Sequence, residues 1–264
     1  MNISYIEKTN WAGKEVYFFD ATDSTNTRAA ELAKKGCSHG ALVIAGKQEA
    51  GKGRRGRSWS SEKGTGIYMS LVLRPDLRPD QASGLTLVAA LSVVKAIEKV
   101  VKEPADIGLQ IKWPNDVVVN KKKVCGILTE MYLEGTQIGS VVTGIGINVH
   151  QKDFPEEIKE TATSLDRETG SCISRSSLIE EILLCFEDYY DKYLQTGDLK
   201  LIKQEYEKYL ANKENKVKVL DPAGAYEGVA KGITRTGELI VDTETGEKHV
   251  SGGEVSVRGI YGYV

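Results

Sequence analysis

Residues 109–149 read LQIKWPNDVVVNKKKVCGILTEMYLEGTQIGSVVTGIGINV, and this stretch decides the fold. Four runs rich in apolar and β-branched residues follow one another at Leu109–Trp113, Val117–Val119, Lys123–Tyr132 and Ile138–Val149. Short polar segments with turn-forming residues separate the runs. Strands joined by such short turns pair with their chain neighbours in antiparallel order. The stretch therefore predicts an antiparallel meander.

Helices and further strands are predicted on both sides of the meander. Each prediction rests on hydrophobic periodicity and on capping or turn residues at the ends of the segment. In chain order the predicted elements are a capped helix at residues 24–36, strands at Leu42–Ala45 and Gly66–Leu73, a buried helix at Leu85–Val101, and amphipathic helices at Leu178–Tyr193 and Leu199–Tyr209. These elements and the meander predict an α+β unit, with a mixed or antiparallel sheet and flanking helices.

The pattern changes after residue 212. Short strand-like runs follow, with turn signals at Pro222-Ala223-Gly224, Thr236-Gly237 and Thr245-Gly246. Such spacing is typical of a small β-barrel. We therefore expect two domains, at residues 1–212 and 213–264.

The composition is that of an ordinary globular protein. The 264 residues include 35 basic and 37 acidic ones, and the net charge of −2 argues against a dedicated nucleic-acid-binding protein. The four cysteines contain no C-x-x-C pair, so neither a zinc site nor a disulfide framework is indicated. No signal peptide or membrane-spanning run is recognisable. We expect a cytoplasmic protein with reduced thiols.

The most distinctive motif is Q-E-A-G-K-G-R-R-G-R-S-W at Gln48–Trp59. Residues 47–57 hold five basic residues and one acidic residue, which predicts a local anion site. Glycine lets backbone N–H groups approach a phosphate, and arginine offers a rigid fork of donors. Two alternatives are a solvated basic loop and a phosphate-binding P-loop, because Gly51–Ser58 reads G-x-x-x-x-G-R-S. The P-loop is disfavoured because the motif leads into a strand and lacks the P-loop lysine.

Two further motifs lie within the meander. Residues 112–116 read K-W-P-N-D, in which a strand delivers a lysine and two polar side chains around a turn. A lone lysine on a strand is usually a solvated surface residue, so this motif gains weight from the basic loop. Residues 143–149 read T-G-I-G-I-N-V, and alternate glycines remove the side chains from one face of the strand. This pattern indicates a backbone held close to a ligand or to another group.

The order of the motifs resembles that of the biotin protein ligases. The shared motifs are S-T-N at residues 24–26, the basic loop at 48–59, K-W-P-N-D at 112–116, G-I-L-T-E at 126–130 and G-I-G-I-N-V at 144–149. Residues 251–258, S-G-G-E-V-S-V-R, resemble the SH3-like C-terminal domain of that family. The resemblance implies a catalytic domain like that of class II synthetases. It also implies a reaction in which biotin and ATP form biotinyl-5′-AMP and pyrophosphate, and biotin then passes to a lysine of a carrier domain.

The resemblance implies the biotin-binding residues motif by motif. The biotin-binding residues would be Ser24, Thr25, Asn26, Gln48, Lys52, Gly53, Arg54, Lys112, Gly144 and Gly146. The first four offer neutral donors and acceptors to the ureido ring, and the strand glycines leave room for the bicycle. Lys52 stands where the family commonly has arginine, which keeps the charge but removes a bidentate fork.

The same transfer implies the nucleotide site. Residues for ATP and the adenylate would be Arg54, Arg55, Arg57, Trp59, Asn115, Asn148 and Arg258. Lys112 and Arg54 would be the catalytic residues, offsetting with Mg²⁺ the repulsion between carboxylate and phosphate. The metal ligands stay unknown. Because the acceptor lysine arrives on the partner, no enzyme nucleophile is expected.

Two alternative functions stay open at this point. One is a lipoate ligase of the same catalytic fold, disfavoured by the basic loop. The other is a small nucleic-acid-binding protein that uses the same loop, disfavoured by the acidic net charge. The implied partner is the biotin carboxyl carrier domain of a carboxylase or decarboxylase. Few residues precede the S-T-N motif, so no DNA-binding module, DNA partner or membrane partner is expected, while a homodimer stays open.

Overall fold

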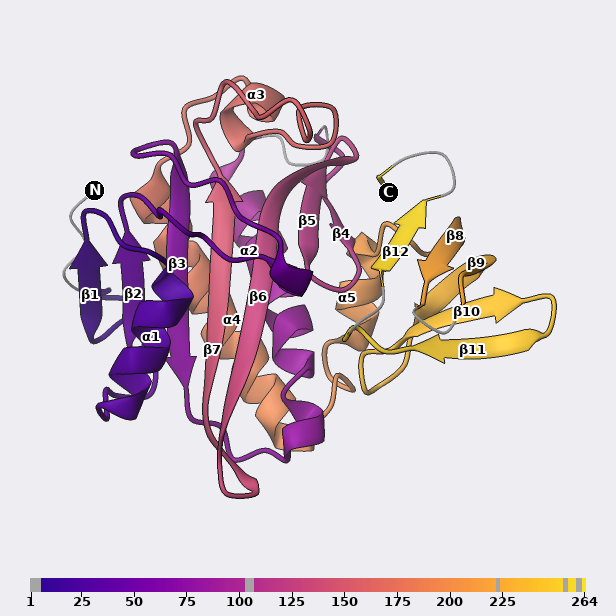
Figure 1. Ribbon diagram of the computed structural model, residues 1–264, viewed down its shortest axis with the longest axis horizontal. Coiled ribbons are helices and arrows are strands. Elements are labelled where there is room, and N and C mark those ends of the chain that lie inside the picture. The colour runs from indigo at the N-terminus through magenta and orange to yellow at the C-terminus, as the bar shows by residue number, and fades with distance from the viewer. Residues whose placement is uncertain (1–5, 103–106, 222–223, 254–255, 260–262) are drawn as a thin grey trace.

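The computed structural model describes residues 6–102, 107–221, 224–253, 256–259 and 263–264, and contains two β-sheets (Figure 1). The larger sheet has seven strands in the order β1-β2-β3-β7-β6-β5-β4. Its strands are β1 Val16–Phe19, β2 Leu42–Ala45, β3 Gly66–Leu73, β4 Gln110–Lys112, β5 Asp116–Val119, β6 Lys122–Glu134 and β7 Gln137–Asn148. This mixed sheet with flanking helices confirms the predicted α+β class.

The predicted meander forms the centre and one edge of this sheet. Strands β4, β5, β6 and β7 pair antiparallel with their chain neighbours. A tight turn joins β6 to β7 and pairs Glu134 with Gln137, and Gly135 in that turn has a φ of +64°. Glycine adopts that left-handed conformation without a steric penalty. The meander is therefore fixed by local turns.

The edge strand β1 was not predicted. It runs parallel to β2, and helix α1 (Thr25–Lys34) connects the two strands. The sequence of β1, V-Y-F-F, shows no alternation and spans four residues, too few for periodicity to indicate a strand. The short helix α3 (Leu165–Thr169) was also missed, because it spans five residues.

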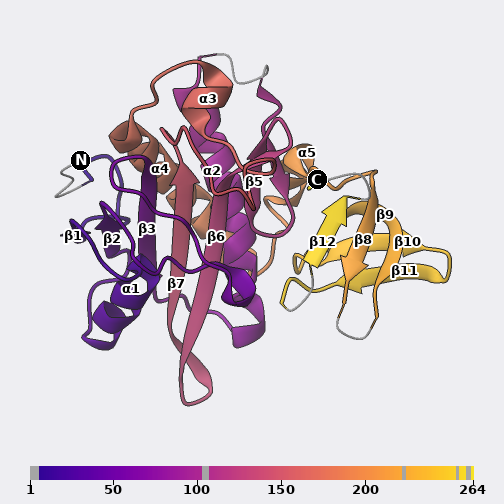
Figure 2. The ribbon, with the colours of Figure 1, turned by 45° about the horizontal axis from the view of Figure 1, so that its top comes forward.

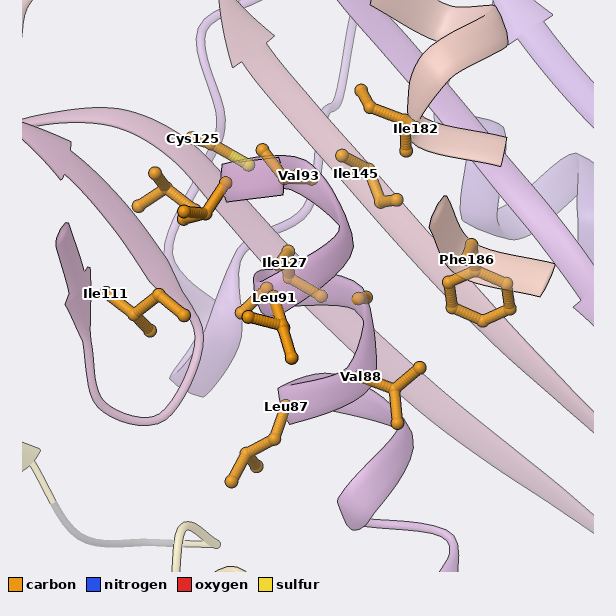
Figure 3. Packing of buried hydrophobic residues seen from close by; sticks show 14 of the residues in the cluster. Leu87, Val88, Leu91, Val93, Ile111, Cys125, Ile127, Ile145, Ile182 and Phe186 are labelled. Atoms are coloured by element: carbon orange, nitrogen blue, oxygen red, sulfur yellow. The ribbon is translucent and has the colours of Figure 1, made fainter. Parts of the chain in front are cut away.

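Helices cover both faces of the large sheet (Figures 1 and 2). On one face lie α2 (Gly84–Val100) and α4 (Arg175–Thr196), both predicted, although α4 extends by about a turn at each end. Figure 3 shows Leu87, Leu91 and Val93 of α2 among side chains of the sheet and of α4. Helix α1 covers the other face, through a smaller cluster of buried alanines and valines.

The second sheet has five strands in the order β11-β10-β9-β8-β12. Its strands are β8 Lys216–Leu220, β9 Tyr226–Ile233, β10 Leu239–Thr243, β11 Gly246–Val250 and β12 Ser256–Gly259. All its pairings are antiparallel, as expected for the small β domain, and α5 (Lys203–Tyr209) precedes it. The expected turns at Thr236-Gly237 and Thr245-Gly246 are present, whereas Pro222 and Ala223 of the first turn lie outside the described residues.

The small sheet is tied to the meander edge beside K-W-P-N-D. Trp113 donates from its indole Nε1 to the Gly237 carbonyl at 2.9 Å, and its backbone N–H donates to Asn212 Oδ1 at 2.9 Å. Trp113 is buried, so these bonds are shielded from water. Among the described residues, no helix is sufficiently long and apolar to cross a membrane.

Candidate active site

A cavity lies on the face of the large sheet that carries α1. Its volume is about 50 Å³. The predicted site residues that line it are Ser24, Thr25, Asn26, Gln48, Lys52, Gly53, Arg54, Trp59, Asn115, Gly144 and Gly146. Motifs that are far apart in the sequence therefore meet at one place.

The first turn of α1 presents neutral polar groups to this cavity. The backbone N–H and the hydroxyl of Thr25 both donate to Gln48 Oε1, at 2.8 and 3.1 Å. The Gln48 amide in turn donates to Ser61 Oγ at 2.8 Å. Ser24 is the N-cap residue of α1, but its side chain makes no capping hydrogen bond. Its hydroxyl is therefore not used to cap the helix.

Asn26 is held more tightly than the sequence suggested. Its amide donates to Glu130 Oε2 at 2.7 Å, and its Oδ1 accepts from Ser70 Oγ at 2.7 Å. A Cβ on Gly144 would collide with Asn26 Oδ1. The glycine on β7 therefore makes room for the asparagine side chain.

Trp59 occupies the space beside the other strand glycines. A Cβ on Gly146 would lie 2.6 Å from the indole, and one on Gly126 would lie 2.8 Å from it. The indole Nε1 is buried and has no hydrogen-bond partner among the described residues. Trp59 therefore packs against the glycine face of the sheet. It fills the space beside Gly146 that was predicted to hold a ligand.

The basic loop folds into one turn that directs Arg54 inward. Gly53 N–H donates to the Arg57 carbonyl at 2.7 Å, and the turn η1 (Arg54–Gly56) contains Arg55 at a φ of +58°. Lys52, Arg55 and Arg57 are exposed, whereas Arg54 is partly buried.

The guanidinium of Arg54 joins three parts of the molecule. It donates to Asn115 Oδ1 at 2.7 Å and to the carbonyl of Gly253 at 3.0 Å, with a further short bond to the Gly252 carbonyl. Burial lowers the pKa of this guanidinium, which nonetheless stays charged. A hollow of about 450 Å³ beside Arg54 is lined by residues of β6 and by residues 236–238 and 251–253, which flank strands of the small sheet. Arg54 thus links the basic loop, the K-W-P-N-D turn and the small sheet.

Lys112 lies at the end of β4, opposite Asp116 in the register. It is 7% exposed and does not line the cavity. Burial lowers the pKa of its ammonium group from 10.5 to about 8, although the charge of Asp116 opposes the change. The positive charges of Lys123, Arg258 and Arg57 lower this pKa further. Three cationic side chains thus lie close enough to Lys112 to affect its charge.

The remaining predicted residues lie outside the cavity lining. Asn148, at the end of β7, donates from its side-chain amide to the Thr163 carbonyl at 3.1 Å and is buried. Arg55 is exposed on the loop. Arg57 and Arg258 are exposed but close enough to Lys112 to affect its pKa.

Several residues around the site were not predicted. Glu130 lies in G-I-L-T-E and Asp116 in K-W-P-N-D, but no role was predicted for either. Lys123 pairs with Asp116 Oδ1 at 2.6 Å and lies over the Trp59 ring, 5.3 Å from its centroid. Tyr263 contacts both Lys112 and Asp116. A charged residue beside a motif was the available signal for the first three, and no signal pointed to Tyr263.

One group of potential metal ligands lies elsewhere. The ligand atoms of His150, Asp166 and Cys172 fall within 4.8 Å of one another, the single such group among the described residues. His150 Nδ1 and Asp166 Oδ2 already form a hydrogen bond of 2.7 Å, and none of the three lines the cavity. We assign no metal to this group.

Comparison with known proteins accounts for this arrangement. Residues 18–148 match the biotin/lipoate A/B protein ligase family, and residues 215–258 match the biotin protein ligase C-terminal domain. The bifunctional ligase/repressor BirA of Bacillus subtilis is 42% identical over 252 residues, which cover 95% of this chain and 76% of BirA. The chain belongs to the biotin protein ligase family.

Other biotin protein ligases match at nearly full length. The biotin–[acetyl-CoA-carboxylase] ligase of Paracoccus denitrificans is 32% identical, over 90% of this chain and 98% of its own. The structure of the Aquifex aeolicus biotin protein ligase with biotin and ATP superimposes with a TM-score of 0.80 at 34% identity. That match covers 93% of this chain and 99% of the Aquifex chain. The recognition made from the motifs is therefore confirmed.

Proposed function

We propose that this protein is an ATP-dependent biotin protein ligase. It activates biotin as biotinyl-5′-AMP with release of pyrophosphate, and then transfers biotin to a lysine of a biotin carrier domain. The observation that supports this most directly is a neutral polar cavity with Arg54 and Lys123 in its lining and Lys112 nearby. The neutral ureido ring of biotin needs neutral polar partners, and its carboxylate needs nearby cations.

Biotin would enter with its ureido ring toward the first turn of α1. A cyclic urea both donates and accepts, and Ser24, Thr25 and Gln48 offer neutral partners of both kinds. A buried charge at that end would be costly without a partner. Asn26 is already bonded to Glu130 and Ser70, so we propose that it orders the pocket wall. Trp59 would shift its indole from the glycine face to admit the bicycle.

The first half-reaction brings two anions together. The biotin carboxylate oxygen attacks the α-phosphorus of ATP, an acyl–phosphate bond forms, and pyrophosphate leaves. We propose that Lys112 neutralises the carboxylate and the transferred phosphate where they meet, and that Arg54 holds the mixed anhydride. We also propose contacts to the nucleotide from Arg55, Arg57, Asn115, Asn148 and Arg258.

Magnesium would enter with the nucleotide. The two carboxylates next to the site are already engaged, Glu130 by Asn26 and Asp116 by Lys123 and Tyr263. Among the residues that the structure describes, the side chains at the site therefore do not fit a resident magnesium ion. Because Mg²⁺ is commonly bound through substrate phosphates, we propose no protein ligand for it and derive no step through it.

The second half-reaction needs no nucleophile from this chain. The amine of the carrier lysine attacks the acyl carbon of biotinyl-5′-AMP, an amide forms, and AMP leaves. We propose a biotin carboxyl carrier domain as the acceptor, a catalytic domain at residues 1–212 and a small β domain at residues 213–264. Cytoplasmic location, the absence of a DNA partner and a homodimer stay predictions, which fractionation, gel-shift and light-scattering measurements would check.

The deciding experiment compares two substrates. The purified protein is incubated with ATP, Mg²⁺ and either radiolabelled biotin or radiolabelled lipoate, and a biotin carrier domain is then added. We expect pyrophosphate release and carrier labelling with biotin alone. The matched control is a carrier domain whose acceptor lysine is changed to arginine, which should stay unlabelled. Labelling with lipoate in preference to biotin would overturn the proposal.

A further inference from the structure

Tyr263 lies against Lys112, the lysine whose charge is proposed to act in the first half-reaction. Its ring centroid is 3.4 Å from Lys112 Nζ, and its hydroxyl donates to Asp116 Oδ2 at 2.5 Å. A cation within about 6 Å of an aromatic ring centroid is attracted by the negative face of the ring. The penultimate residue of the sequence therefore belongs to the surroundings of Lys112.

The ammonium of Lys112 has little else to hold it. Among the residues that the structure describes, no hydrogen bond or ion pair engages Lys112 Nζ. A lysine side chain has several rotatable bonds, so an unrestrained ammonium group samples many positions. Electrostatic catalysis requires a fixed ammonium group, because the charge must already be at the place where the two anions meet.

Asp116 is the carboxylate best placed to form an ion pair with the Lys112 ammonium group. It is the register partner of Lys112 across the β4–β5 pair. Its two oxygens nevertheless have other partners: Oδ1 forms an ion pair with Lys123 at 2.6 Å, without a hydrogen bond, and Oδ2 accepts a hydrogen bond from the Tyr263 hydroxyl. A direct ion pair with Asp116 would cancel the charge that the substrates need. Tyr263 therefore occupies the carboxylate and offers the lysine a ring face that attracts the cation without neutralising it.

We propose that Tyr263 is a positioning residue for Lys112, holding its ammonium group in place by the ring and keeping Asp116 from pairing with it by the hydroxyl. This inference rests on the proposed function, because it concerns the formation of biotinyl-5′-AMP. It adds an aromatic residue near the end of the sequence to a site otherwise built from the large sheet, α1 and the basic loop.

Two substitutions separate the two contributions of Tyr263. Tyr263→Phe keeps the ring and frees Asp116 Oδ2, while Tyr263→Leu removes both. We expect the kcat of pyrophosphate release to fall in both variants, and about three- to thirtyfold in Tyr263→Leu, the range of a partly buried cation–π contact. The dissociation constant for biotin should change less than kcat, because Tyr263 does not line the cavity in which the ureido ring would bind.

The pH profile distinguishes positioning from a general structural effect. The charged groups that face Lys112 are Asp116, Lys123, Arg57 and Arg258. Once freed, Asp116 raises the pKa of Lys112, and the loss of the ring in Tyr263→Leu exposes the ammonium group and raises the pKa again. The alkaline limb of the rate should therefore move to higher pH in both variants. A rate that falls while the limb stays in place would indicate a loss of packing alone and would overturn the inference.

Tyr226→Leu is the matched control. Tyr226 lies on β9 under Lys248, 4.1 Å from Nζ to the ring centroid, and does not line the cavity. Removing this similar contact should leave the rate and the pH limb unchanged. If Tyr263→Leu fails to fold, Tyr263→Phe still tests the hydroxyl. Unchanged or faster turnover with an unmoved limb in Tyr263→Phe and Tyr263→Leu would overturn the inference, whereas a wild type that forms no biotinyl-5′-AMP would overturn the proposed function.

Discussion

Lys112 is buried and lies beside the carboxylate of Asp116, and these two features shift the pKa of its ammonium group in opposite directions. Burial destabilises the ammonium form, and the Asp116 charge stabilises it. The balance leaves a lysine that is charged at neutral pH but not strongly solvated. Such a group interacts more strongly with an arriving anion than a surface lysine does, because less water has to be displaced.

Replacing Lys112 by alanine should affect the chemistry more than binding. The charge contributes most when carboxylate and phosphate are forced together, so we expect the kcat of pyrophosphate release to fall about 10²–10³-fold. The biotin dissociation constant, measured by calorimetry without ATP, should rise much less. Equal losses in both quantities would show instead that Lys112 is an anchor for bound biotin.

The pH dependence of adenylation follows from the same lysine. Its pKa in the free protein is about 8, so it is charged below that pH and loses its proton above it. We expect kcat/KM for pyrophosphate release to fall by about tenfold per pH unit above this pKa. Lys112→Arg is the control, because a guanidinium keeps its charge and the fall should disappear at whatever rate remains. An unchanged alkaline limb in Lys112→Arg would assign the limb to another group.

At the scale of elements, the basic loop combines internal order with repulsion. Its turn is closed by the bond from Gly53 to Arg57, while Arg55 adopts a left-handed φ that is unusual for a residue with a side chain. Three arginines within four residues repel one another until an anion reaches them. The loop is therefore expected to become more stable when the adenylate forms.

Limited proteolysis should show this stabilisation. Trypsin cleaves after exposed arginines, so we expect cleavage near Arg55 to slow severalfold when biotin and ATP are both present. Mass spectrometry of the fragments gives the rate, and cleavage after Lys200, which is exposed and does not line the cavity, serves as the internal control. Equal rates near Arg55 with and without both substrates would exclude ordering by the adenylate.

At the scale of the whole molecule, Arg54 bonds the basic loop to the K-W-P-N-D turn and to the segment that follows β11. We expect Arg54→Gly to release biotinyl-5′-AMP about ten- to a hundredfold faster, because each charge-assisted hydrogen bond lost is worth roughly 1.5–3 kcal/mol. The released adenylate would acylate exposed lysines. A lysine-rich bystander protein, incubated with biotin and ATP and then blotted for biotin, measures the escape.

Arg167→Gly is the control for this measurement, because Arg167 is exposed and does not line the cavity. It should label the bystander no more than the wild type does. If Arg54→Gly still forms the adenylate but labels no more bystander than Arg167→Gly, Arg54 does not retain the intermediate, and Lys52 or Arg57 becomes the candidate.

Much of this molecule could be predicted because its signals are local. The meander and α2 are encoded in hydrophobic periodicity and turns, and the cavity in short motifs whose side chains share one strand face or one helix turn. The missed features depend on distance along the chain. Tyr263 and Asp116 are 147 residues apart in sequence, and the pairing of Asn26 with Glu130 depends on the register of strands between them. No local pattern records such contacts.

The strand glycines show the same limit in another way. Alternation at Gly144 and Gly146 predicted correctly that something approaches the backbone. In this structure the approaching groups are Asn26 and Trp59, side chains from other elements. A glycine pattern specifies an empty position, and the tertiary structure decides what occupies it.

The bonds of Arg54 to the small sheet end on two backbone carbonyls, those of Gly252 and Gly253. Every amino acid supplies that same oxygen, so exchanging the side chains at these positions would not delete the acceptors. A library of single substitutions across the small sheet would therefore tend to score this junction as tolerant. Its genetic vulnerability is concentrated on the arginine itself, and on insertions or deletions that displace the main chain.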